Sequence, residues 1–143
     1  MSFLQSLNIS GSGLTAQRLR MDIISENIAN MDTTRTQEGG PYRRKMVVLE
    51  SSDSFKNKLL KNIKDYKAGG VEVAEIVEDP SEFKKVFNPD HPDADENGYV
   101  NMPNVDSLKE TVDLMEAFRA YQANVTALNT LKQMAVKALE IGR

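Results

Sequence analysis

The residues best suited to chemistry lie in one acidic turn. Asp93, Asp95 and Asn97 alternate along the chain, and Gly98 follows them. This spacing matches the start of an EF-hand calcium loop, in which oxygen ligands stand at the first, third and fifth positions and a glycine at the sixth. The twelfth position, which needs a bidentate Glu, is Asn104. Because Asn-Gly is itself a strong turn pair, the pattern favours an acidic turn between short strands and leaves a calcium-binding module as an alternative.

Neighbouring residues raise two further chemical hypotheses. His91 stands between Asp90 and Asp93, but it is the single His of a chain without Cys, which makes a poor transition-metal site. The carboxylates nearby suggest a glycosidase pair, yet the chain has no Trp to form a sugar platform. Neither a phosphate-binding glycine loop with Lys nor a Gly-x-Ser-x-Gly elbow is present. The sequence therefore predicts no enzyme, no cofactor, no metal and no small-molecule substrate.

Composition bounds the remaining classes of function. The chain has 143 residues, enough for one domain, with 40% hydrophobic and 27% charged residues. Its formal net charge of -3 argues against nucleic acid as a partner, because phosphate binding requires a basic face. No apolar run approaches the ~18–20 residues of a membrane span, and the first residues lack the basic and apolar regions of a cleavable signal.

The C-terminal segment, residues 105–143, predicts one long helix. It contains neither Pro nor Gly from Val105 to Ile141, and Asn104 or Asp106 is suited to cap its beginning. Apolar residues recur at steps of three, four or seven, which is typical of an amphipathic helix. They are Leu108, Val112, Met115, Phe118, Val125, Leu128, Ala135 and Leu139, with Leu114, Tyr121 and Leu131 widening the stripe.

The N-terminal segment, residues 1–31, predicts a second amphipathic helix from about Leu4 to Met31. Its apolar residues at seven-residue steps are Leu7, Leu14, Met21 and Ile28, with Ile24 beside them. Gly11 and Gly13 fall inside this pattern. Two glycines in a helix interior cost roughly 2 kcal/mol relative to alanines, so this helix is expected to be weak in isolation.

The central segment, residues 32–104, predicts a small β-rich module with glycine and proline turns. The expected strands are 42–49, 71–77, 81–88 and 98–102. Residues 71–104 carry nine acidic residues and two lysines. A Lys-rich stretch, residues 51–68, has the spacing of a basic amphipathic helix, which either lies on an anionic membrane or, as we favour, covers the β module with its lysines in water.

The length of the C-terminal helix implies a partner. Thirty-seven helical residues extend about 55 Å, whereas a compact chain of this size is about 37 Å across. The helix must therefore project with its apolar stripe. It has to pair with the N-terminal helix, with other copies of the chain or with another protein.

Both ends of the chain resemble the axial proteins of the bacterial flagellar rod and hook. The N-terminal resemblance rests on residues 12–16 (SGLTA) and 26–30 (ENIAN), and the C-terminal one on 104–105 (NV), 116–125 (EAFRAYQANV) and 129–132 (NTLK). The linking segments 88–92 (NPDHP) and 98–104 (GYVNMPN) are similar to those of a basal-body rod protein of the proximal type.

This resemblance implies a structural rod subunit with a mainly α fold and a small β-rich insert. Its long terminal helices would pair as an antiparallel, coiled-coil-like stalk, with a central module of short strands. The partners would be copies of itself, other rod proteins, and adjoining export-gate and ring components of the basal body. The resemblance also implies export by the flagellar type III apparatus without a cleaved signal, to the periplasmic rod.

The assembly interface is expected on the apolar faces of the two helices, within one subunit or between subunits. Amides on these faces would fix the register through buried hydrogen bonds, at some cost in stability. The predicted interface residues are Leu7, Leu14, Met21, Ile24, Asn27, Ile28, Asn30, Leu114, Met115, Phe118, Tyr121, Gln122, Asn124, Val125, Leu128 and Leu131. Two amphipathic helices also suit a cytosolic coiled-coil adaptor or chaperone, which remains the other alternative.

Overall fold

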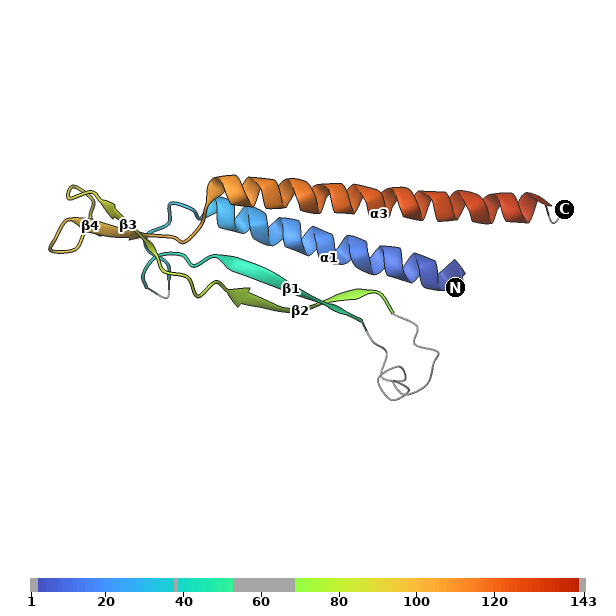
Figure 1. Ribbon diagram of the computed structural model, residues 1–143, viewed down its shortest axis with the longest axis horizontal. Helices are drawn as coiled ribbons and strands as arrows, with labels where there is room; N and C mark the ends of the chain where they lie inside the picture. The colour runs from blue at the N-terminus through green and yellow to red at the C-terminus, as the bar shows by residue number, and fades with distance from the viewer. Residues whose placement is uncertain (1–2, 38, 53–68, 142–143) are drawn as a thin grey trace, which may run out of the picture.

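The computed structural model describes residues 3–37, 39–52 and 69–141, and shows an elongated molecule in which a helix lies between a second helix and a sheet (Figure 1). Helix α1 is Phe3–Ala29 and helix α3 is Ser107–Ile141. They run side by side in opposite directions, so that both ends of the described chain lie at the same end of the molecule (Figure 1). The 35 residues of α3 give it a length of about 52 Å.

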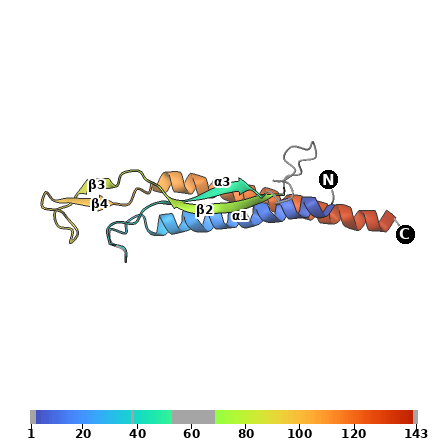
Figure 2. The same cartoon turned by 90° about the horizontal axis from the view of Figure 1, so that it is seen from below.

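Two antiparallel hairpins connect the helices. Strand β1, Lys45–Ser51, pairs with β2, Val71–Glu78, and this sheet packs on α1. Strand β3, Lys84–Phe87, pairs with β4, Tyr99–Met102, in a second sheet that lies beyond the beginning of α3. Figure 2 shows the molecule from below, with the β3–β4 hairpin and the end of α3 again at opposite extremes. The prediction of a mainly α protein with a small β insert is confirmed.

The first strand begins later than the sequence predicts, at Lys45 instead of Tyr42. The backbone amide of Tyr42 donates to the Thr33 carbonyl (3.0 Å), and that of Arg44 donates to the Asn104 side chain (2.8 Å). These amides are therefore unavailable for a ladder. The Lys-rich stretch lies almost entirely outside the described residues.

The serines and glycines of the α1 interior bring neighbouring elements close. A Cβ on Gly13 would lie 3.1 Å from the Asn124 amide nitrogen of α3, so glycine permits close approach of the helices here. The hydroxyl of the neighbouring Ser12 donates to the Ile9 carbonyl (2.9 Å) and accepts the Val71 amide of β2 (3.1 Å). Gly70, at φ +119°, lies directly against Ser12, so these small residues hold the hairpin on α1.

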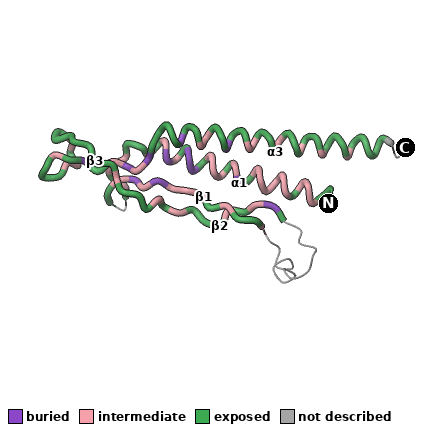
Figure 3. The backbone as a smooth tube through the Cα atoms, in the orientation of Figure 1, coloured by how far each residue is buried: buried purple, intermediate pink, exposed green. Residues whose placement is uncertain are grey.

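Buried residues gather where the end of α1, the beginning of α3 and the strands meet, while much of α3 is exposed (Figure 3). The buried apolar residues are Ala16, Ile23, Ile24, Tyr42, Val100, Val105 and Ala117. Helix α3 begins at a cap in which the Asp106 carboxylate accepts the Leu108 amide (3.0 Å). Within the described ranges, neither helix is long and apolar enough to cross a bilayer.

A buried polar junction and an exposed helix face

The expected interface residues divide into two groups by burial. On α1, Ile24 and Asn27 are buried, and Leu7, Leu14, Met21, Ile28 and Asn30 are half-buried. On α3, the half-buried residues share the side that carries Ala117: Leu114, Tyr121, Asn124, Val125, Leu128 and Leu131. Met115, Phe118 and Gln122 are exposed. One subunit thus covers part of the predicted interface and leaves the rest open.

Asn27 is the centre of a buried polar junction between α1, β1 and α3. Its amide nitrogen donates to Glu110 Oε2 (3.0 Å) and to the Lys45 carbonyl (2.9 Å). Its amide oxygen accepts from Tyr42 Oη (2.9 Å) and from the Lys45 backbone amide (2.9 Å). Asn27 is fully buried, and an amide has two donor and two acceptor positions. All of them are used, so the junction fixes one register of the helices and β1.

Arg44 and Glu110 form an ion pair inside this junction. Arg44 Nε donates to Glu110 Oε1 at 2.6 Å, and Glu110 has no exposed surface. The same guanidinium lies 3.4 Å from Asp113 and 3.6 Å from Asp79. Because a buried carboxylate without a partner is costly, Glu110 depends on Arg44 and Asn27 together.

Asn104 connects the junction to the second hairpin. Its side-chain oxygen accepts the Arg44 backbone amide, and its nitrogen donates to the Asp79 carbonyl (3.1 Å) and the Ser81 hydroxyl (2.9 Å). Hydrogen bonds from the Ser81 backbone and side chain lower the pKa of the Asp79 carboxyl, and nearby Arg44 lowers it further. Asp79 is therefore kept charged opposite the guanidinium.

The sequence interpretation missed Tyr42, Arg44 and Glu110. One signal was available, since Glu110, Ala117 and Asn124 follow each other at seven-residue steps on the α1 side of α3. A charge on a helix-contacting face requires a buried partner. The sequence does not say which of several basic residues supplies it.

Tyr42 makes the junction sensitive to alkaline pH. Burial raises the pKa of its phenol to about 12, and the carboxylates of Glu26, Glu110 and Glu78 add to the rise. Since this pKa is higher in the folded state, the neutral phenol stabilises the fold below pH ~10, and this contribution is lost as the pH rises toward about 12.

We expect Tyr42→Phe to remove this alkaline loss of stability. At neutral pH the variant should lose about 1 kcal/mol, because the hydrogen bond to Asn27 is absent. Urea denaturation at pH values from about 8 to about 12 measures the difference from the parent chain. Tyr121→Phe on α3 is the control and should keep the parent's alkaline profile. A constant difference between Tyr42→Phe and the parent across this range would contradict the prediction.

The acidic turn is used to hold the β3–β4 end together. Asp93 accepts from the Thr34 hydroxyl (2.8 Å) and pairs with Arg35 (2.9 Å), while Asp95 Oδ1 accepts the backbone amides of Asn97 and Tyr99 (both 2.9 Å). The His91 ring accepts the Asp93 amide (3.1 Å). Among the residues that the structure describes, no group of three or more His, Cys, Asp or Glu side chains is placed to hold a metal.

Curated relatives match the chain along its whole length. A protein named flagellar basal-body rod protein FlgC from Bacillus subtilis is 53% identical over 150 aligned positions, covering 100% of both chains. The chain belongs to the FlgC family of flagellar basal-body rod proteins. Proteins of the same name from Borreliella burgdorferi and Salmonella typhimurium are 44% and 41% identical, over 98–100% of each chain. The family is structural and not enzymatic.

Two family models match the two ends of this FlgC-family chain. Residues 7–37 match the model described as flagella basal body rod protein, and residues 96–141 match the C-terminal model of flagellar basal body rod FlgEFG proteins. Asn27 lies in the first region and Glu110 in the second. Tyr42 and Arg44 come from the segment between them, so the junction joins both matched regions to the central module.

Proposed function

We propose that this chain is a structural subunit of the basal-body rod that assembles through the side of α3 left open by α1. The observation that carries the proposal is an exposed apolar stripe on the first half of α3. Leu108 is 79% exposed, Met115 48% and Phe118 50%. Val112 continues the stripe. A helix that already buries one face and still exposes such a stripe favours a second packing partner.

The stripe borders a hollow that suits an incoming side chain. The hollow has a volume of about 470 Å³ and lies between α1 and α3, lined by Met21, Leu114, Met115, Phe118, Arg119 and Gln122. Most of these residues belong to the interface expected from the sequence. We therefore assign Met21, Met115, Phe118 and Gln122 to contacts between subunits, and Ile24 and Asn27 to contacts within one subunit.

The paired helices form the stalk of this assembly. Glu110, Ala117 and Asn124 meet α1 at seven-residue steps, which supports coiled-coil-like packing. The partners we propose are copies of this chain, other rod proteins, and the ring and export-gate components at the base of the rod. The location that follows is the periplasmic rod, reached by flagellar type III export. The names of the curated relatives support a place in the basal-body rod and give no support to an adaptor or a calcium-binding module.

Mass spectrometry of detergent-extracted basal bodies from the source cell tests the proposal. We expect this chain in fixed proportion to the other rod proteins. Its absence from basal bodies of a flagellated cell would contradict the assignment. A cytosolic protein that fractionates with soluble partners would then be the better description.

A further inference from the structure

The β3–β4 hairpin exposes an aromatic ridge, formed by Phe87 and Tyr99, at the end of the molecule opposite the termini (Figure 1). The two residues are direct partners in the sheet, and their rings meet edge to face with centroids 5.3 Å apart. Phe87 is nevertheless 64% exposed and Tyr99 44%. Val100 of β4, on the opposite face of the hairpin, is buried, but within the described chain neither strand lies against another helix or strand. A two-stranded hairpin of this kind is marginally stable alone, so the ridge favours a covering partner.

The tip that carries the ridge is acidic and held in place. Residues 88–98 contain Asp90, Asp93, Asp95 and Glu96 but neither Lys nor Arg. The pairing of Asp93 with Arg35 and the hydrogen bonds to Asp95 fix the loop to the rest of the molecule. Asp90, Asp95 and Glu96 are exposed, so the loop beyond the ridge offers negative charge. The exposed Lys85, two residues before Phe87 on the same face of β3, places one positive charge on the other side of the ridge.

The opposite end of the molecule is a projecting helix end with complementary chemistry. Asn27 contacts Glu110, and Gly13 approaches Asn124, so each step back along α1 is one step forward along α3. This register puts Phe3 level with Met134, and the last turns of α3 extend beyond α1 (Figure 1). Val136 is 48% exposed and Leu139 76%.

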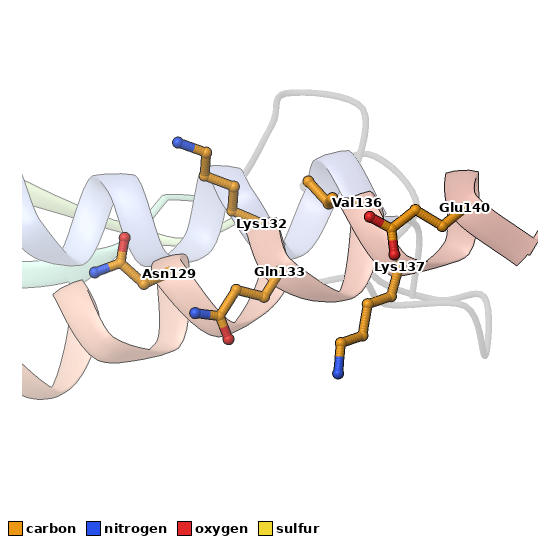
Figure 4. Close-up of a pocket in the computed structure, with 6 residues that line it drawn as sticks. All are labelled: Asn129, Lys132, Gln133, Val136, Lys137 and Glu140. Atoms are coloured by element: carbon orange, nitrogen blue, oxygen red, sulfur yellow. The ribbon is translucent and has the colours of Figure 1, made fainter.

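Lysines flank this apolar end. Figure 4 shows Lys132 and Lys137 reaching out from α3 in opposite directions, with Val136 between them in sequence. A shallow hollow of about 460 Å³ runs along this side of the helix, lined by Asn129, Lys132, Gln133, Val136, Lys137 and Glu140. The projecting end is therefore apolar and carries two lysines against Glu140, whereas the aromatic ridge lies beside a loop with four acidic residues.

We propose that the aromatic ridge docks on the projecting C-terminal helix end of the next subunit along the rod. Phe87 and Tyr99 would cover the apolar residues at the positions of Val136 and Leu139, with lysines at the positions of Lys132 and Lys137 facing the acidic loop. This inference rests on the proposed function, because subunits that share one orientation in an open assembly meet through unlike ends. The occupant is defined by its chemistry: an amphipathic helix end that is apolar and lysine-flanked.

Site-specific photocrosslinking in the full-length chain tests this contact. The photoreactive residue p-benzoylphenylalanine replaces Phe87, cells are irradiated, and the linked peptides from purified basal bodies are identified by mass spectrometry. We expect a link to the last turns of the C-terminal helix of a rod subunit. The same probe at Val48, an exposed position on β1, is the control and should give no such link.

The outcomes separate this inference from the proposed function. Absence of the parent chain from basal bodies contradicts the rod assignment itself. The probe variant can instead be incorporated without a link to a C-terminal helix end, or with a link to another segment. Either result contradicts the docking but not the rod assignment. If the probe at Phe87 blocks incorporation, the probe moves to Leu139, where the expected link is to a β3–β4 hairpin and its absence overturns the proposal.

Discussion

Phe118→Asp is expected to abolish rod assembly and swimming motility while leaving the subunit folded. Phe118 is 50% exposed on the open side of α3, so a carboxylate there remains in water in the free subunit. Losing the contacts of the covered half of the ring should cost about 1–2 kcal/mol, which leaves the subunit folded. In the assembled rod the same carboxylate would be buried against an apolar surface without a partner, which costs several kcal/mol. Swimming assays and the amount of the chain in purified basal bodies measure the effect.

Ala127→Asp is the matched control for this variant. Ala127 is exposed on the same helix, and nine residues, or two and a half helical turns, place it half a turn away from Phe118. The control introduces the same charge into α3 but outside the proposed seam, so motility should be retained. Normal swimming by the Phe118→Asp strain would rule out the open side of α3 as the assembly surface.

Arg44→Leu is expected to destabilise the subunit by about 3–5 kcal/mol, the usual cost of removing one member of a buried ion pair. The substitution leaves the fully buried Glu110 carboxylate without its guanidinium partner, and Asp79 and Asp113 lose the same cation. Because small domains have total stabilities of about 5–15 kcal/mol, a loss of this size would unfold a measurable fraction of the subunits. Urea denaturation followed by circular dichroism gives the free energy of unfolding.

Arg43→Leu is the control for this stability measurement. Its guanidinium lies 4.5 Å from the centre of the Phe83 ring and 3.9 Å from Glu78, and it donates to the carbonyls of Asp79 (3.0 Å) and Ser81 (3.3 Å). Because none of these partners is a fully buried charge, its loss should cost about 1–2 kcal/mol. The double variant Arg44→Leu with Glu110→Leu should be more stable than Arg44→Leu alone, since it removes the orphaned charge. An Arg44→Leu cost no greater than that of Arg43→Leu would contradict a central role for the buried pair.

The helices could be predicted from sequence because their signals are local. Apolar periodicity and the absence of Pro and Gly define α3, and its observed bounds, Ser107–Ile141, differ little from the expected 105–141. Asp106, one of the two predicted caps, is the residue that caps it. Helix α1 forms across Gly11 and Gly13, where tertiary contacts with α3 and β2 offset the low helix propensity.

The division of the interface could not be read from the sequence. The stripe on α3 is broad, and nothing in its pattern says that α1 takes the side of Ala117 and leaves Phe118 in water. That choice follows from the register set by Asn27 and Glu110, a contact across 83 residues of chain. The start of β1 was misplaced for the same reason, since the amides of Tyr42 and Arg44 bond to residues outside the sheet.

The location of the junction has a mechanical consequence. The hydrogen bonds of Asn27 and the Arg44–Glu110 pair run across the molecule, from α1 and β1 to α3, near one end of the paired helices. A load that slides α1 along α3 would stretch these bonds together instead of one after another. The subunit should therefore resist shear most strongly at the junction and yield first at the beginning of α1, the part of the helix pair that lies farthest from these bonds.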